Sequence, residues 1–84
     1  MKRSRDTIIS KILDVCIGGA HKTRIVYQAN MNLRTVNPYL DLLTINGMIG
    51  SQKVSNLVVY ETTTRGLALL ENYKQIQSEL SPIT

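Results

Sequence analysis

The sequence predicts a small, mainly α-helical domain of the α+β class with one β-hairpin in its second half. Apolar residues recur at spacings of three and four over most of the chain, which is the periodicity of amphipathic helices. Between residues 48 and 62 the pattern changes to β-branched and aromatic runs around a polar turn, which indicates two strands. The predicted order is three helices, two strands and a fourth helix.

The composition favours one folded domain spanning residues 1–84. Its 43% hydrophobic and 19% charged content is typical of a globular protein. Ten Lys and Arg against six Asp and Glu leave a net charge of +4, which suits a polyanion ligand but also solubility alone. Because there is one cysteine and no apolar run of membrane-spanning length, we expect a cytoplasmic protein without a disulfide or a membrane segment.

The first two helices are predicted from short apolar patterns. The first begins near Arg5 and ends at Gly18-Gly19. The second opens at residues 21–24, with Thr23 as its candidate N-cap and His21 as a solvated position. Its inward face consists of Ile25, Val26 and Ala29. A turn at residues 30–32 leads to the next helix, and two helices joined by about three residues are the helix-turn-helix arrangement.

The third predicted helix spans residues 32–46, with Asn32 as N-cap and the left-handed end supplied by Asn46-Gly47. Three apolar residues at spacings of four and three form its inward face: Val36, Leu40 and Leu43. Pro38 lies between them and removes one N–H donor. Either the helix is continuous and bends there, which the inward spacing favours, or its regular part starts at Pro38 with Asn37 as cap.

The remainder of the chain completes a winged helix-turn-helix. A hairpin over residues 48–62, with a polar turn at residues 54–56, corresponds to the wing. Thr63 is predicted to cap a final helix over residues 63–80, in which Gly66 indicates the close approach of another group. Four residues of this helix recur as an a/d seam, and we expect them to form a homodimer: Leu69, Tyr73, Ile76 and Leu80.

Catalytic chemistry is not indicated by any motif. One His and one Cys cannot provide the four ligands of a structural zinc site, and the carboxylates are scattered over different elements. No glycine-rich phosphate loop is present. We therefore expect no enzyme activity, metal or cofactor.

Polar residues converge instead on one predicted surface that suits double-stranded DNA. Arg34, Thr35 and Asn37 are predicted to face outward from the third helix, where Arg can bond guanine and Asn can bond adenine. Candidate phosphate contacts come from the second helix and the wing, and comprise Lys22, Thr23, Arg24 and Lys53. Asp41 lies on the same helix face and would repel phosphate. The alternatives are ordinary solvated positions, or a winged-helix module that binds another protein without binding DNA.

The order and spacing of several short motifs resemble a family of small archaeal winged-helix transcriptional regulators. The matching motifs are Gly19-Ala20 before Lys22-Thr23, Ile25 with Tyr27, Tyr39-Leu40 with Leu43, Asn46-Gly47 before Met48-Ile49, and Thr63 to Gly66 followed by Leu70 and Tyr73. Pro38 departs from the family, which has a helix-favouring polar residue there. The resemblance implies a DNA-binding domain that often dimerises through its C-terminal helix, in some relatives as an antiparallel coiled coil.

Overall fold

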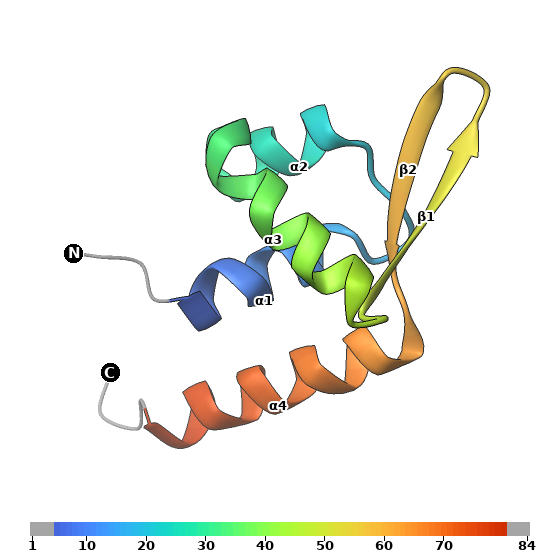
Figure 1. Ribbon diagram of the computed structural model, residues 1–84. Helices are drawn as coiled ribbons and strands as arrows, with labels where there is room; N and C mark the ends of the chain where they lie inside the picture. Colours follow the sequence, from blue (N-terminus) through green and yellow to red (C-terminus); the bar gives the residue numbers. More distant parts are fainter. Residues whose placement is uncertain (1–4, 81–84) are drawn as a thin grey trace.

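A computed structural model describes residues 5–80, with side chains described for residues 5–76. The chain forms α1 (Arg5–Val15), α2 (Lys22–Ala29), α3 (Leu33–Ile45), β1 (Ile49–Val54), β2 (Leu57–Thr62) and α4 (Thr64–Leu80). Helices α1, α2 and α3 pack together, the hairpin projects from them, and α4 runs back along the opposite side of α1 (Figure 1). This is the predicted order, so the winged-helix fold class is confirmed.

The core is built from aliphatic side chains and one thiol, with no Phe or Trp in the chain. Its fully buried members come from α1 and the turn after it, α2, α3 and β1, and the largest are Ile12, Leu13, Ile25, Leu40, Ile49, Val36 and Cys16. The buried apolar residues of each helix recur at helical spacing and therefore share one face. The inward faces that the sequence predicts are therefore those that the structure buries.

Helix α3 is continuous through Pro38, which excludes a start at that residue with Asn37 as cap. Its N-cap is Asn32, whose Oδ1 accepts a hydrogen bond from the N–H of Thr35 at 2.9 Å, and Gly47 follows its end with a φ of +75°. An interior proline costs a helix about 3 kcal/mol or more. Burying Val36 before it and Leu40 after it contributes about 1.5–3 kcal/mol for each side chain, which offsets that cost.

The wing is a two-stranded antiparallel hairpin whose last pair is Val54 with Leu57. Val54, which the sequence pattern assigns to the turn, is therefore the end of β1. The turn consists of two residues, and the first of them, Ser55, has a φ of +56°. Two-residue hairpin loops favour a positive φ at this position because it matches the right-handed twist of the strands.

Helix α4 is tied to the rest of the fold at its first turn. The hydroxyl of Thr63 donates to the carbonyl of Gly47 at 2.6 Å and accepts from the N–H of Gly66 at 3.1 Å, as expected of the predicted N-cap. A Cβ on Gly66 would overlap the carbonyl oxygen of Met48. The predicted close approach is thus confirmed, and only glycine leaves room for it.

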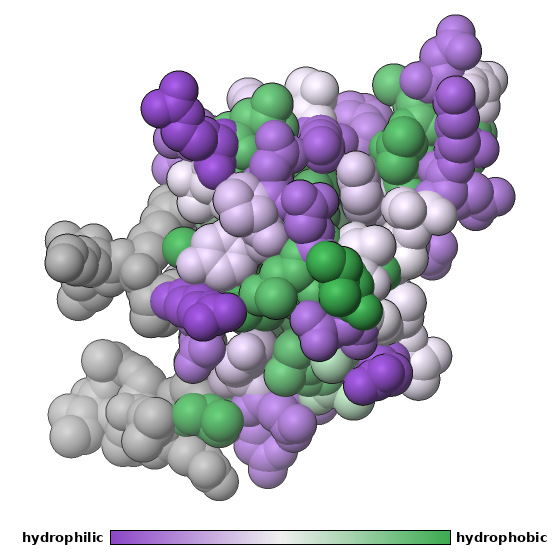
Figure 2. All heavy atoms as spheres, viewed as in Figure 1, coloured by the Kyte–Doolittle hydropathy of each residue, from purple (hydrophilic) through white to green (hydrophobic). Residues whose placement is uncertain are grey.

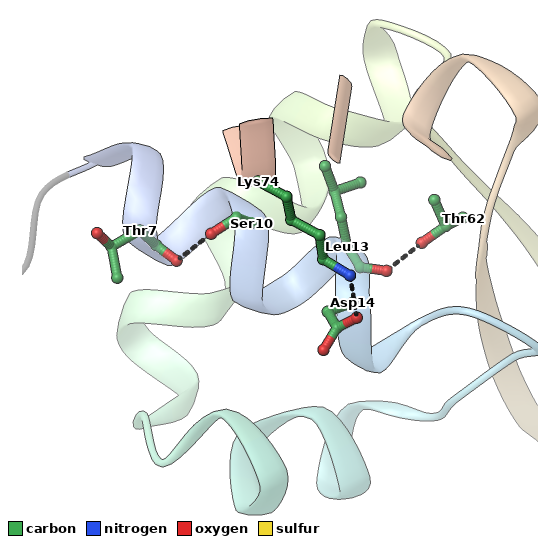
Figure 3. A network of polar contacts seen from close by, with 6 residues as sticks. All are labelled: Thr7, Ser10, Leu13, Asp14, Thr62 and Lys74. Carbon is green, nitrogen blue, oxygen red and sulfur yellow. Dashed lines mark hydrogen bonds and ion pairs between the residues drawn. The ribbon is translucent and has the colours of Figure 1, made fainter. Parts of the chain in front are cut away.

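Helix α1 holds both β2 and α4 through polar contacts (Figure 3). The hydroxyl of Thr62 at the end of β2 donates to the carbonyl of Leu13 at 2.6 Å in a buried hydrogen bond. Lys74 of α4 approaches Asp14 of α1 at 3.7 Å, with both side chains more than half exposed, so this ion pair contributes little. The hairpin base is therefore held by a buried bond and α4 mainly by apolar packing.

Candidate nucleic-acid interface

One exposed stripe runs along the outer side of α3. Arg34, Pro38, Asp41 and Ile45 are all exposed and follow one another at spacings of four, three and four. These spacings place them on one side of the helix, opposite the buried Val36. Of the three predicted reading residues, Arg34 is the one that stands on this stripe.

Thr35 and Asn37 lie on the two flanks of α3 and are half-buried. Successive helical residues are rotated by about 100°, so a buried Val36 turns its neighbours sideways rather than outward. The Oδ1 of Asn37 is buried and has no hydrogen-bond partner among the described residues. Bidentate pairing of Asn37 with adenine would therefore need its amide to rotate toward the groove.

Helix α2 begins differently from the sequence prediction. Its N-cap is His21, whose Nδ1 accepts a hydrogen bond from the N–H of Arg24 at 3.3 Å. Thr23, the predicted cap, lies in the first turn with an exposed side chain. The prediction was wrong because His21, not Thr23, has the extended backbone of a cap, with φ −89° and ψ 167°.

The start of α2 is held beside the wing by backbone hydrogen bonds. The N–H of Ala20 donates to the carbonyl of Tyr60 at 2.9 Å, and the N–H of Tyr60 donates back to Ala20 at 2.8 Å. A shallow cleft of about 210 Å³ lies between the two elements. It is lined by His21, Lys22, Thr23, Asn56, Leu57, Val58 and Tyr60. The bridge thus brings two predicted phosphate-binding residues to the wing tip.

Lys53 stands on the cleft side of the wing. It pairs with Val58 across the hairpin, and directly paired residues share a face of a sheet. The sequence does not indicate that residues of β2 line this cleft, because α2 and β2 are brought together by the Ala20 bridge. Lys22 lines the cleft and Lys53 stands beside it on the wing, whereas the exposed Arg24 lies two residues further along α2 and faces another side of that helix.

The cations of this surface have no carboxylate partner among the residues the structure describes. The ion pair that the described residues form joins Lys74 of α4 to Asp14 of α1. The same surface is not uniformly polar: Figure 2 shows hydrophobic residues over the C-terminal part of α3 and along the wing. Ile45 is 82% exposed, and Val54 and Leu57 at the wing tip are 51% and 56% exposed.

The predicted dimer residues of α4 differ in their surroundings. Leu69 and Tyr73 are half-buried against the core of their own chain. Burial raises the pKa of the Tyr73 phenol, and the nearby Asp6 carboxylate raises it further. Ile76 is 49% exposed, while the side chain of Leu80 lies outside the described residues.

Within the part of the chain that the structure describes, no three His, Cys, Asp or Glu side chains are grouped as metal ligands. Cys16 is fully buried, and burial raises the pKa of its thiol to about 11. A protonated, inaccessible thiol is a poor nucleophile and a poor ligand. None of the described helices is long and apolar enough to cross a bilayer.

The fold and this surface define a winged helix-turn-helix protein. A family model described as winged helix-turn-helix matches residues 2–81, and the chain belongs to that family. The uncharacterized protein MJ0287 of Methanocaldococcus jannaschii is 42% identical over 53 residues, covering 62% of this chain. The match spans about half of that relative, or 55% of its length.

Solved structures with this fold include archaeal proteins. The structure of Sso10a-2, a DNA-binding protein from Sulfolobus solfataricus, matches with a TM-score of 0.81 and 28% identity, covering 93% of this chain and 85% of that one. F93 from STIV, a winged-helix DNA-binding protein, has a TM-score of 0.79 and 17% identity, covering 95% of this chain and 96% of its own; at that identity it shows the shared fold. The resemblance to small archaeal winged-helix proteins is thus confirmed.

Proposed function

We propose that this protein binds double-stranded DNA and regulates transcription as a homodimer in the cytoplasm. The observation that carries the proposal is the position of Arg34. It is the exposed cation of the α3 stripe, and further cations stand at the start of α2, Lys22 and Arg24, and on the wing, Lys53. Sso10a-2 and F93, which share the fold, are both described as DNA-binding proteins, which supports the proposal.

In this proposal α3 enters the major groove with the side that carries Arg34 toward the bases. Arg34 lies in the first turn of α3, where recognition helices contact base edges. Its guanidinium would donate two hydrogen bonds to guanine O6 and N7. Thr35 and Asn37, on the flanks, would reach the groove walls, with Asn37 reading adenine after rotation of its amide.

Phosphate contacts would come from the elements on either side of the cleft. Lys22, Thr23 and Arg24 lie in the first turn of α2, where free N–H groups and the helix dipole also favour an anion. Lys53 would contact a DNA phosphate from the wing. Such contacts position the protein on the duplex but carry no sequence information.

The proposal is tested by fluorescence anisotropy with duplexes selected from a random library, at two salt concentrations. We expect binding that weakens with salt, and a loss of specific affinity of roughly 1–3 kcal/mol in Arg34→Ala with relaxed choice at one base position. Lys11→Ala removes the same charge from the exposed side of α1 and serves as control. Binding that is absent at low salt, or independent of salt, would refute the proposal.

A protein-binding module is the second candidate, and the exposed apolar residues favour it. Tyr27 on α2 is 85% exposed and Ile45 on α3 is 82% exposed, so a protein partner that covered them would remove this apolar surface from water. The two functions predict different effects of Ile45→Ser. The substitution would abolish capture of a protein partner, whereas DNA affinity centred on Arg34 would change little.

A further inference from the structure

The stripe on α3 carries one carboxylate among the residues that would face DNA. Asp41 follows Arg34 by seven residues, and two such positions differ in direction by only about 20°. If Arg34 faces the base edges, Asp41 faces them too. The spacing corresponds to about 10.5 Å along the helix, which spans at most about three base pairs of about 3.4 Å rise each.

No neighbour on the helix neutralises Asp41. The positions three and four residues away on either side are Pro38 and Asn37 before it, and Thr44 and Ile45 after it, none of which carries a charge. Among the described residues the ion pair involves Asp14 and Lys74 instead. Asp41 is exposed in the free protein, so water solvates its carboxylate until a ligand displaces that water.

A carboxylate in the major groove accepts hydrogen bonds and donates none. Guanine presents only acceptors there, and thymine presents an acceptor and a methyl group. The major-groove edge of adenine presents its amino donor beside an acceptor, N7, whereas that of cytosine presents the N4 amino donor alone. A base without a donor would leave the carboxylate desolvated and unpaired, which is strongly unfavourable.

We propose that Asp41 is a specificity-determining residue that selects cytosine within about three base pairs of the guanine bound by Arg34. This inference rests on the proposed function, because it requires α3 to lie in the major groove. Arg34 and Asp41 then give the helix a direction on the duplex, with a donor near its start and an acceptor two turns later. The carboxylate acts chiefly by excluding bases that would repel it.

The test is selection of bound duplexes by the wild-type protein and by Asp41→Asn, followed by affinity measurements on the selected sites. We expect wild-type sites to hold cytosine at that position and to lose roughly fivefold or more in affinity when it is changed to guanine. Asp41→Asn should lose this preference. Asp14→Asn makes the same chemical change on the other side of the protein, where it should leave the selected sequence unaltered.

Two results would overturn the inference while leaving DNA binding intact. Asp41→Asn could tighten binding to all sequences equally, which would place the carboxylate against phosphates, or it could leave the base preference unchanged. If the wild-type protein bound no duplex even at low salt, the proposed function itself would fail. The salt titration with Arg34→Ala separates that outcome from the first two.

Discussion

His21 and Asn32 occupy the same position at the start of two consecutive helices, and each accepts a hydrogen bond from the backbone N–H three residues later. Asn32 is predictable because Asn is among the preferred N-cap residues, and histidine is not. Thr23 has the right chemistry but lies within the first turn of α2. Residue preference therefore identifies a cap only where the backbone is already extended, and the backbone at His21 is set by the neighbouring bridge of Ala20 to β2.

Cys16 provides a prediction at the scale of a single group. Burial raises the pKa of its thiol to about 11 in the folded protein, above the ordinary value of 9.0. The folded state thus holds this proton more tightly than the unfolded state, so the contribution to stability is complete below pH 9 and is lost as pH rises to about 11. The loss should reach about 2–3 kcal/mol.

Urea unfolding at pH 8, 9, 10 and 11 measures this loss in the wild-type protein and in Cys16→Ala. The variant should be less stable than the wild-type protein at pH 8 because it leaves a cavity, so the comparison concerns the slope and not the absolute value. Tyrosines titrate in both proteins and cancel. Parallel curves for the two proteins would show that the thiol is not desolvated.

At the scale of elements, packing decides the outcome wherever the local sequence is compatible with two different structures. Helix α3 continues through Pro38 because apolar residues before and after it are buried in the same core. Strand β1 of the wing ends one residue later than its composition suggests, because Val54 still pairs with Leu57. Both results come from contacts with another element, which a single segment of sequence does not encode.

Gly66 provides the prediction at this scale. In a helix, Gly→Ala ordinarily stabilises by about 1 kcal/mol. Here the new Cβ would overlap the carbonyl of Met48 and the side chain of Thr62, so Gly66→Ala should lower the free energy of unfolding by about 1–3 kcal/mol. Gly50→Ala is the matched control, since its Cβ would meet only ordinary contacts. A Gly66→Ala variant as stable as the parent would show that α4 shifts away from Met48 at little cost.

At the scale of the whole molecule, α4 covers α1 with its first half and leaves apolar surface further along. Leu69 and Tyr73 are half-buried within the chain, and Ile76 is half-exposed. A second copy of the same helix is the partner we propose for this surface, because identical faces pair readily in two-fold dimers.

Ile76→Glu tests the dimer by sedimentation velocity. We expect the wild-type protein to sediment as a dimer and the variant as a monomer, because a carboxylate buried in an apolar interface is unpaired. The substitution should leave the fold intact, as Ile76 is 49% exposed. Gln75→Glu adds the same charge at a neighbouring exposed position and should stay dimeric. If Ile76→Glu sedimented as a dimer, the interface would lie elsewhere.

The sequence alone determined the order of helices and strands, the buried face of each, and the caps at Asn32 and Thr63, because these depend on residues only a few positions apart. Tertiary structure decided which polar residues share a surface. It left Asn37 half-buried with its Oδ1 unpaired, brought Lys22 to the wing tip, and left the stripe that carries Arg34 and Asp41 exposed. The physical reason is that a local pattern specifies which side of a helix is apolar. Whether each of its other sides is covered or exposed depends on the elements packed beside it.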